Sequence, residues 1–279
     1  MSTHDIKIIA LDLDGTLLDS EKRLSPGNLK ALTAASEAGI EIVPATGRLY
    51  NGMPEAVRSL PFIRYAITVN GAQVLDVKSG ETMYGSAIST EDALALCRYL
   101  DTLPVIYDCY SDGGAYMTQS MYDAAAEYIE DRHSLKMVKD LRRPVPELKA
   151  FIEGGGRSPQ KMQLFTKDDA LRSELLTSLP LRFPQFAITT SLPQNIEINN
   201  IETDKGKALL GLAARLGFAP EQTMAIGDGL NDMTMLKAAG TGVAMGNAHP
   251  DILKIADKIT SDNDHDGVAD AIYQVLDSR

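Results

Sequence analysis

Two aspartates, Asp12 and Asp14, are the first residues whose types and spacing can do chemistry; they lie in the segment DLDGTL at residues 12–17. They directly follow a short apolar run, IKIIAL at residues 6–11, which predicts a buried strand. Side chains at the carboxyl end of such a strand face the crevice where open α/β sheets bind ligands. One carboxylate can attack phosphorus, and the other can protonate the leaving oxygen and then activate water. The segment therefore predicts a nucleophile and a general acid/base rather than an acidic turn.

Two further segments can bind phosphate. Thr46 and Gly47 lie in PATGR at residues 44–48, at the end of the next apolar run, and a hydroxyl followed by a glycine amide can hold a phosphate oxygen. Lys205 starts a helix predicted over residues 205–216, where the helix dipole disfavours a positive charge unless an anion binds there. Taken singly, each signal also fits an ordinary turn or a solvated surface lysine.

The fourth candidate is Asp228, in the segment GDGLND at residues 227–232, which follows a short predicted strand. Magnesium prefers an octahedron of hard oxygens, with water and phosphate completing the set. Asp228 can therefore complete a magnesium site with the Asp12 carboxylate and a carbonyl oxygen. A Gly/Asn/Asp turn is the alternative interpretation. The two acids that flank an asparagine at a third strand end favour the metal site.

The elements that must position these residues predict an α/β fold. Strands predicted over residues 6–11, 40–45 and 65–69 alternate with helices, the first of which begins at Ser25-Pro26. This alternation predicts a Rossmann-like parallel sheet with right-handed crossovers. The same pattern returns after residue 205 and ends in a helix over residues 267–276.

The middle of the chain breaks this alternation, beginning with a hairpin predicted around Ser79-Gly80. Further strands and helices follow there in an α+β order, with helices predicted at 89–99, 121–132, 146–153 and 168–177 and strands at 105–110, 115–118, 161–165 and 185–190. We therefore expect an inserted α+β cap domain over residues 85–198, between the first part of the core at 1–84 and the second part at 199–279. We expect Gly154-Gly155-Gly156 to be flexible and the insertion to determine substrate choice.

Composition narrows the function classes. The chain has 279 residues and a formal net charge of −11, which argues against binding nucleic acid or an anionic membrane but leaves room for a small anionic substrate. Its N-terminal apolar run is too short and too charged for a signal peptide or membrane helix. Two cysteines, Cys97 and Cys109, match no metal-ligand pattern and suggest a reducing compartment. These features predict a cytoplasmic protein whose oligomeric state the sequence leaves open.

Together the four segments resemble the haloacid dehalogenase superfamily of phosphohydrolases over nearly the whole chain. TVNGA at residues 68–72, the insertion and Asp266-Gly267-Val268 resemble its Cof-like subfamily. The run EINNI at 197–201 departs from that subfamily, whose members often carry Pro and Gly there, so the cap boundary stays open.

The resemblance implies a role for each motif residue. It implies Asp12 as nucleophile, Asp14 as general acid/base, and magnesium held by Asp12, the Asp14 backbone carbonyl and Asp228. It also implies phosphate contacts from the Leu13 amide, Thr46, Gly47, Lys205 and Asn231, and supporting positions at Asp232, Arg48 and Asn70.

The function we expect is magnesium-dependent hydrolysis of small phosphorylated metabolites through an aspartyl-phosphate. Sugar phosphates are the first expected substrates, followed by phosphorylated cofactors such as FMN or pyridoxal phosphate. A phosphosugar mutase on the same core is one alternative. A non-enzymatic phospho-accepting module is another, but receivers of that kind are about half this length and do not need Asp14.

Overall fold

The computed structural model describes residues 5–154, 158–190, 192 and 194–278, and the chain divides into two compact units. The first unit, which we call the core, contains residues 1–85 and 204–279; the second, which we call the cap, contains residues 86–203. The sequence-based limits of the insertion are residues 85 and 198. Of the glycine run expected to be flexible, Gly155 and Gly156 lie outside the described residues.

The core is built on a five-stranded parallel sheet with the strand order β14-β13-β12-β1-β2. Its strands are β1 (Ile8–Leu11), β2 (Glu41–Pro44), β12 (Thr223–Gly227), β13 (Thr241–Ala244) and β14 (Lys258–Ile259). The chain leaves β1 toward one edge and leaves β12 toward the other. Ligands bind at such a reversal of strand order, outside the carboxyl ends of the strands. The ends of β1 and β12 are therefore where this sheet is expected to hold a site.

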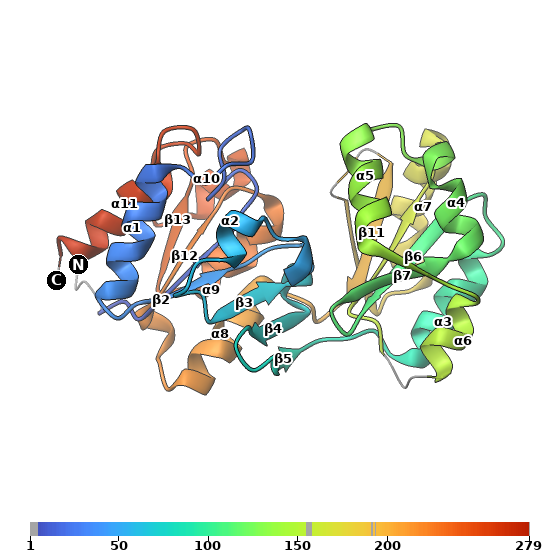
Figure 1. The fold of residues 1–279 in the computed structure, drawn as a ribbon, viewed down its shortest axis with the longest axis horizontal. Helices are drawn as coiled ribbons and strands as arrows, with labels where there is room; N and C mark the ends of the chain where they lie inside the picture. Colours follow the sequence, from blue (N-terminus) through green and yellow to red (C-terminus); the bar gives the residue numbers. More distant parts are fainter. Residues whose placement is uncertain (1–4, 155–157, 191, 193, 279) are drawn as a thin grey trace. The chain divides into compact units, whose positions relative to one another are not determined.

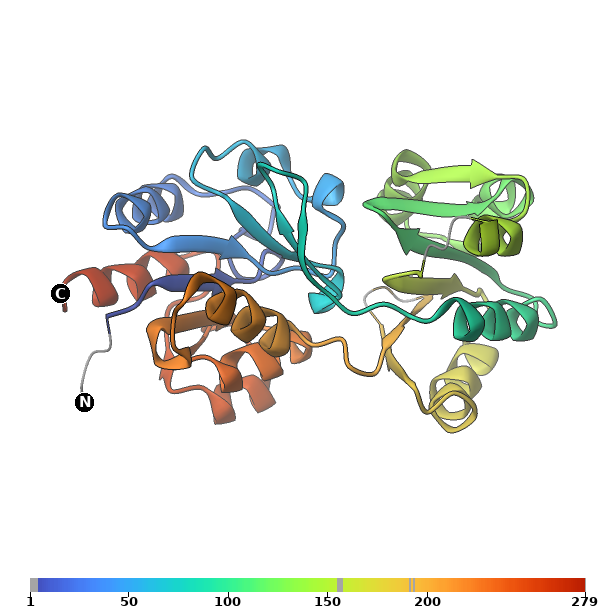
Figure 2. The same ribbon diagram turned by 90° about the horizontal axis from the view of Figure 1, so that it is seen from below.

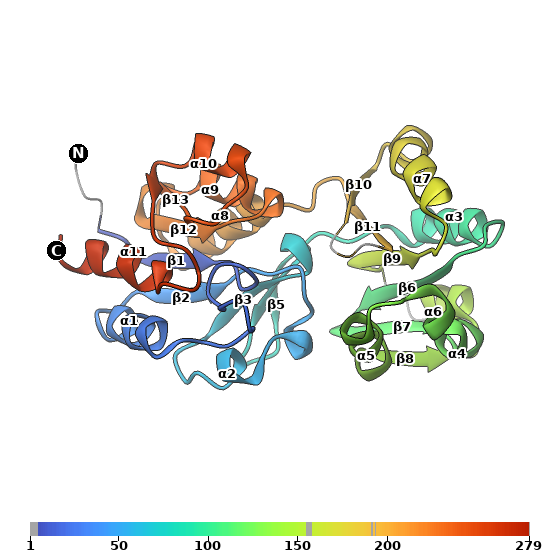
Figure 3. The ribbon, with the colours of Figure 1, turned by 90° about the horizontal axis from the view of Figure 1, so that it is seen from above.

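Helices cover both faces of this sheet (Figures 1–3). The helices α1 (Pro26–Glu37) and α11 (Gly267–Leu276) lie on one face, and α8 (Lys205–Leu216), α9 (Met233–Ala238) and α10 (Pro250–Ile255) lie on the other. Helix α1 starts where expected because the Ser25 hydroxyl accepts a hydrogen bond from the Asn28 amide and Pro26 follows it. The doubly covered parallel sheet confirms the predicted α/β, Rossmann-like core.

The expected third parallel strand behaves differently. Strand β3 (Tyr65–Thr68) pairs antiparallel with β4 (Gln73–Asp76), which pairs with β5 (Thr82–Gly85) in a separate three-stranded sheet. Its link to β2 is a single parallel bridge between Ala45 and Ile67. Because β2 ends at Pro44, which has no N–H to donate, the ladder cannot continue along β2 as the sequence pattern suggested. Among the remaining elements of the core is the short helix α2 (Glu55–Arg58).

The cap is an α+β unit, as predicted, with a six-stranded sheet in the order β10-β11-β9-β6-β7-β8. Its strands are β6 (Ile106–Ser111), β7 (Gly114–Thr118), β8 (Arg142–Val145), β9 (Lys161–Phe165), β10 (Phe186–Thr189) and β11 (Asn195–Asn200). One face of the sheet packs against the helices α3 (Thr90–Leu100), α6 (Leu148–Gly154) and α7 (Asp169–Arg182). The helices α4 (Gln119–Tyr128) and α5 (Arg132–Leu141) pack over part of the other face.

Three features of the cap differ from the sequence-based expectation. The helix expected over residues 121–132 ends at Tyr128, and α5 starts a new helix that Asp131 caps through the Ser134 amide. Strand β8 was not expected because it contains Pro144, which an edge strand tolerates. Strand β11 was not expected, although its two isoleucines alternate with polar residues as strand residues do. In the part of the chain that the structure describes, no helix is both long and apolar enough to cross a membrane.

Candidate active site

The acidic candidates meet at the carboxyl ends of β1 and β12. One carboxylate oxygen from each of Asp12, Asp228 and Asp232 lies within 4.8 Å of the others. The Asp12 amide donates to the Ile226 carbonyl at 3.0 Å, which joins the ends of the two strands. Two sequence segments more than 200 residues apart therefore supply one cluster of hard oxygen ligands, of the kind that divalent cations such as magnesium prefer.

Lys205 lies inside this cluster and is fully buried. Its ammonium group contacts Asp12 Oδ1 at 2.7 Å and Asp232 Oδ1 at 2.6 Å. Helix α8 starts here because the Asp204 carboxylate caps it, accepting hydrogen bonds from the amides of Gly206 and Lys207. Lys205 is therefore not a solvated surface lysine: two carboxylates compensate its position at the helix N-terminus. Burial alone would lower its pKa, but Asp12 and Asp232 together raise it.

The carboxylates outnumber the lysine, and their pKa values reflect burial first and the neighbouring charges second. Burial raises the pKa of Asp12 to about 7; Lys205 opposes the shift, while Asp232 and Asp228 add to it. Burial likewise raises the pKa of Asp228 to about 6, although a hydrogen bond from Thr16 opposes the shift. A divalent cation would balance the excess negative charge, so these residues fit the metal that the motifs predict.

The loop after β12 depends on Asp232. Its second oxygen, Oδ2, accepts hydrogen bonds from the amides of Asp228 at 3.1 Å and Gly229 at 2.9 Å. A Cβ at Gly227 would come within 2.6 Å of the Asp232 side chain, so the loop needs glycine there. Asp232 thus fixes both the ammonium group of Lys205 and the backbone that carries Asp228.

Asp14, two residues after Asp12, faces a different set of partners. The Arg48 guanidinium donates two hydrogen bonds of 2.8 Å to the Asp14 carboxylate, and the Lys22 ammonium contacts Asp14 Oδ1 at 2.9 Å. Arg48 is in turn anchored on the Gly52 carbonyl at 3.1 Å. Burial would raise the pKa of Asp14, but Arg48 and then Lys22 hold it below its usual value. Sequence reasoning named Arg48 as a supporting residue and missed Lys22, which no motif marks.

Sequence reasoning also missed the role of Thr16, although it lies within the first motif. The buried Thr16 hydroxyl donates to Asp228 Oδ1 at 2.6 Å and so aims a carboxylate that lies 212 residues away along the chain. Gly15 between the two aspartates and this threonine has a φ of +88°, and a Cβ there would come within 2.5 Å of Asp228 Oδ2. The glycine and threonine of the motif therefore both serve the approach of Asp228.

The phosphate-binding candidates occupy the loops beside these groups. The Thr46 side chain is buried, and its hydroxyl accepts a hydrogen bond from the Arg48 amide at 3.2 Å. A Cβ at Gly47 would come within 2.7 Å of Asn70 Oδ1, so these two residues touch. Asn70 has a φ of +59°, and the β-branched Val69 before it has a φ of +54°. Such a conformation is costly for a branched side chain, and backbone strain of this kind is concentrated at functional sites.

The two remaining candidates are Leu13 and Asn231. The Leu13 side chain is buried in the hydrophobic interior. Its backbone amide lies between Asp12 and Asp14 in the sequence. Asn231 is exposed in the short 3₁₀ turn η4 (Leu230–Asp232). A Cβ at Gly229 would come within 2.5 Å of Asn231 Oδ1, so the glycine makes room for that side chain. All the candidate residues therefore belong to the core unit.

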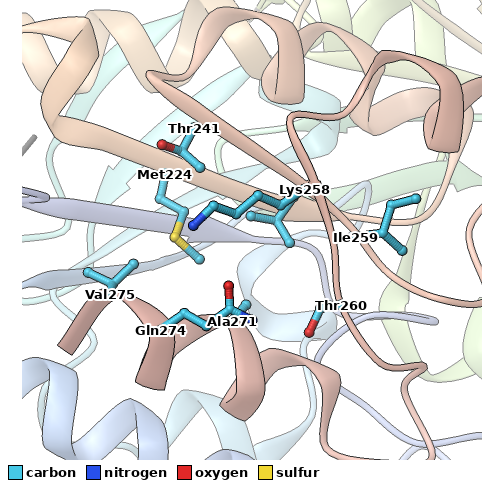
Figure 4. Close-up of a pocket in the computed structure, with 9 residues that line it drawn as sticks. Met224, Thr241, Lys258, Ile259, Thr260, Ala271, Gln274 and Val275 are labelled. Carbon is cyan, nitrogen blue, oxygen red and sulfur yellow. The ribbon is translucent and has the colours of Figure 1, made fainter. Parts of the chain in front are cut away.

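A small hollow elsewhere in the core is not part of this site. It lies between the sheet and α11 (Figure 4) and is lined by Met224, Thr241, Val243, Lys258, Ile259, Thr260, Ala271, Gln274 and Val275. Its volume is about 10 Å³, room for one water molecule at most. It shares no residue with the acidic cluster, so we regard it as a packing gap.

Comparisons with known proteins identify the family of the chain. The family model for haloacid dehalogenase-like hydrolases matches residues 9–272. The 5-amino-6-(5-phospho-D-ribitylamino)uracil phosphatase YcsE of Bacillus subtilis is 33% identical over 273 residues, covering 96% of this chain and 95% of the relative. Pyridoxal phosphate phosphatase YbhA of Escherichia coli is 28% identical over 274 residues, covering 97% and 98%.

Solved structures give the same result. The crystal structure of a haloacid dehalogenase-like hydrolase from Bacteroides thetaiotaomicron matches with a TM-score of 0.82 and 30% identity, covering 97% of this chain and 99% of that one. The family match spans the strands and loops that carry all four motifs. The chain therefore belongs to the haloacid dehalogenase-like hydrolase family and is one of its phosphatases.

Proposed function

We propose that this phosphatase hydrolyses small phosphate monoesters with Asp12 as the nucleophile, and that it depends on magnesium. The observation that carries the proposal is the environment of Asp12. Its Oδ1 is 2.7 Å from a fully buried lysine, and Asp228 and Asp232 lie in the same cluster. A carboxylate in this setting can attack an electrophile while the lysine offsets negative charge on the transferring phosphoryl group.

In the proposed reaction, an Asp12 oxygen forms a bond to phosphorus and the ester P–O bond breaks. Asp14 gives a proton to the leaving alcohol, which departs, and the phosphoryl group remains on Asp12. Asp14 then takes a proton from water, whose oxygen attacks phosphorus and releases inorganic phosphate and free Asp12. Because Arg48 and Lys22 favour the ionised form of Asp14, at least one of these contacts must loosen before proton donation.

The metal proposal rests on charge and ligand type. Ionised Asp12, Asp228 and Asp232 carry three negative charges around the one positive charge of Lys205. We assign the metal to Asp12, the Asp14 backbone carbonyl and Asp228; when bound, magnesium would stabilise negative charge on the phosphoryl oxygens. The Leu13 amide, Thr46, Gly47 and Asn231 would hold the phosphate.

For the substrate we propose sugar phosphates and related polyol phosphates. One relative is named for a substrate with a phosphorylated ribityl chain, and another for pyridoxal phosphate. A panel of phosphorylated metabolites, assayed for free phosphate with magnesium present, tests both the activity and the class. Release of phosphate that Asp12→Asn abolishes would support the proposal. Isomerisation of a sugar phosphate without net phosphate release would instead favour a mutase.

A further inference from the structure

A short acidic segment near the end of the chain has no role in the site described above. It comprises residues 262–266 (DNDHD), between β14 and α11, and we call it the acidic segment. Among the described residues, the only group of three or more acidic side chains whose oxygens converge is that of Asp12, Asp228 and Asp232. The three aspartates of the acidic segment therefore form no second cluster of that kind, and their neighbours must explain their placement.

The acidic segment contacts the loop that follows β1. We call residues 12–25, which include both motif aspartates, the β1 loop. Asn263 Nδ2 donates a hydrogen bond to the Leu18 carbonyl at 3.0 Å. Asp264 accepts hydrogen bonds from the Ser20 amide at 2.8 Å and from the Ser20 hydroxyl at 2.7 Å. Side chains from one end of the sequence thus hold a loop from the other end.

A second asparagine reinforces the contact made by Asn263. Asn247, in the loop after β13, accepts a hydrogen bond from the Asn263 backbone amide at 3.1 Å through Oδ1. Its Nδ2 donates to the Gly15 carbonyl at 2.8 Å. The β1 loop is therefore tied down at Gly15, Leu18 and Ser20, within the eight residues that follow Asp12.

Leu18 is the residue at which the β1 loop folds back on its own start. Its amide donates to the Leu13 carbonyl at 2.9 Å, and it forms an isolated β-bridge with Asp14. The Leu18 side chain is fully buried, and Asn263 is only 8% exposed. Because the Leu13 carbonyl belongs to the peptide group that joins Leu13 to Asp14, a shift of Leu18 would move Asp14 relative to Asp12. The Asn263 contact therefore acts on the spacing of these two aspartates.

Helix α11 does not need the Asn263 contact in order to pack on α1. Burial of apolar surface is enough to hold two helices together. The two helices share one hydrophobic cluster, to which they contribute Ala31, Leu32, Ala35, Val268, Ala271 and Ile272. The Asn263 side chain bonds instead to the backbone of the β1 loop. Its position is thus better explained by that loop than by the docking of the helix.

We propose that Asn263 is a positioning residue for phosphoryl transfer: by holding the Leu18 carbonyl, it keeps Asp14 where it can protonate the leaving oxygen while Asp12 attacks phosphorus. This inference rests on the proposed function, from which it takes the roles of Asp12 and Asp14. Asn263 supplies no reacting atom and acts through the backbone of the β1 loop. Small displacements at a reacting centre reduce the rate by large factors, because the acid, the nucleophile and the ester must be aligned.

The decisive variant is Asn263→Ala in the full-length protein, which removes the Nδ2 donor. Thr223→Val is the matched control, because the buried Thr223 hydroxyl also donates to a backbone carbonyl, that of Pro220, at 2.6 Å. Thr223 lies at the amino end of β12, whereas the acidic cluster lies at the carboxyl end. Asp264→Ala is a second test variant. It removes the exposed contacts to Ser20, and surface changes of this kind rarely impair folding.

Hydrogen exchange of backbone amides measures the positioning without any reaction. In Asn263→Ala, exchange over residues 13–20 should accelerate roughly tenfold, and in Asp264→Ala roughly two- to fivefold. Exchange in α1 and α11 should stay at the wild-type rate, and Thr223→Val should match wild type over residues 13–20. If α1 and α11 exchanged faster to the same extent as the β1 loop, Asn263 would only dock the helices and the inference would be overturned.

Phosphate release in saturating magnesium measures the consequence for the reaction. The substrates are p-nitrophenyl phosphate and three alkyl phosphates, namely glucose 6-phosphate, ribose 5-phosphate and glycerol 3-phosphate. For the alkyl phosphate that wild type hydrolyses fastest, Asn263→Ala should lower kcat roughly ten- to hundredfold with KM nearly unchanged. The loss for p-nitrophenyl phosphate should be smaller, because its leaving group needs little protonation. A variant that had only lost stability would keep the wild-type ratio of the two rates at temperatures well below its Tm, and Thr223→Val should keep that ratio.

The negative results have different meanings. If wild type releases phosphate from none of these esters, the proposed function is wrong, and the exchange measurement alone decides whether Asn263 positions the β1 loop. Unchanged exchange over residues 13–20 in Asn263→Ala overturns the inference. Faster exchange with an unchanged ratio of rates makes the contact purely structural and also overturns it. If Asn263→Ala does not fold, Asp264→Ala decides by the same two measurements.

Discussion

The acidic cluster of the core and the two buried ion pairs of the cap sheet, Asp108–Arg142 and Lys161–Glu197, are both buried networks of charge, but they are balanced differently. The core cluster has three carboxylates and one lysine, whereas the cap has two cations paired with two anions. In the core, burial raises the pKa of Asp12 to about 7, and the neighbouring carboxylates of Asp232 and Asp228 add to the shift. A cluster with a net charge favours an ion of opposite charge, whereas a pair of balanced charges does not. Charge balance therefore distinguishes the proposed metal site of the core from the buried ion pairs of the cap.

The largest expected effect comes from Asp12→Asn. The amide keeps the shape of the acid but cannot attack phosphorus, so we expect turnover to fall by at least roughly 10³-fold. Folding should survive, because Lys205 keeps its contact with Asp232. Asp277→Asn, the same change at an exposed position, is the control and should match wild type. Steady-state phosphate release together with circular dichroism measures both effects, and near-normal activity of Asp12→Asn would contradict the assignment.

Metal removal should have a comparable effect and should depend on pH. Because burial raises the pKa of Asp12 to about 7 and of Asp228 to about 6, both carboxyls hold their protons more tightly in the folded metal-free protein than in the unfolded chain. Their contribution to stability is therefore present below pH about 4 and is lost as the pH rises to about 7. Magnesium binding requires the ionised forms, so its stabilisation should grow over the same range.

Thermal unfolding at pH 5.5 and pH 8, with and without magnesium, tests whether stability falls with pH in the metal-free protein while the stabilisation by magnesium grows. We expect a clear rise in Tm on adding magnesium at pH 8 and a much smaller one at pH 5.5. EDTA should abolish turnover, and calcium, with longer and more numerous oxygen contacts, should fail to replace magnesium. Full activity in EDTA, or equal rates with both ions, would remove the metal from the mechanism.

Asp14→Asn should have a smaller and substrate-dependent effect. A poor leaving group such as a sugar alcohol needs the proton from Asp14, whereas p-nitrophenolate departs without one. We expect losses of roughly 10²- to 10⁴-fold for the sugar phosphate and a smaller loss for p-nitrophenyl phosphate in the phosphorylation step. Single-turnover measurements separate the two steps. Equal losses for both substrates would mean that Asp14 does not act as the acid.

The core site could be predicted from sequence because its acidic residues directly follow strands and lie in short contiguous motifs. The motifs led to Asp12, Asp228 and Asp232, which the structure gathers in one cluster. Lys22 could not be predicted, because it reaches Asp14 from a turn with a φ of +63° and no motif marks it. The antiparallel pairing of β3 escaped as well, since a buried apolar run does not specify the direction of its partner.

The buried ion pairs of the cap escaped sequence analysis for a different reason. The paired residues come from four strands and meet only through strand register, so no sequence motif joins them. Strand β11 was missed because Glu197 and the asparagines around it suggest an exposed segment, although Ile196 and Ile198 alternate with them as strand residues do. In the structure Asn195, Glu197 and Asn199 are buried in the sheet.

The smallest effect on activity is expected from changes at the Asp108–Arg142 pair. The quantity that tests charge balance there is the free energy of unfolding. Arg142→Met alone leaves the Asp108 carboxylate fully buried and unpaired, and should reduce the free energy of unfolding by about 3–5 kcal/mol. Asp108→Leu/Arg142→Met removes both charges and should lie close to wild type. Denaturant unfolding of the two single variants and the double variant gives the coupling energy directly. If the double variant lost as much stability as the sum of the single variants, the pair would not act as a balanced unit, and the contrast between the core and the cap would lose its physical basis.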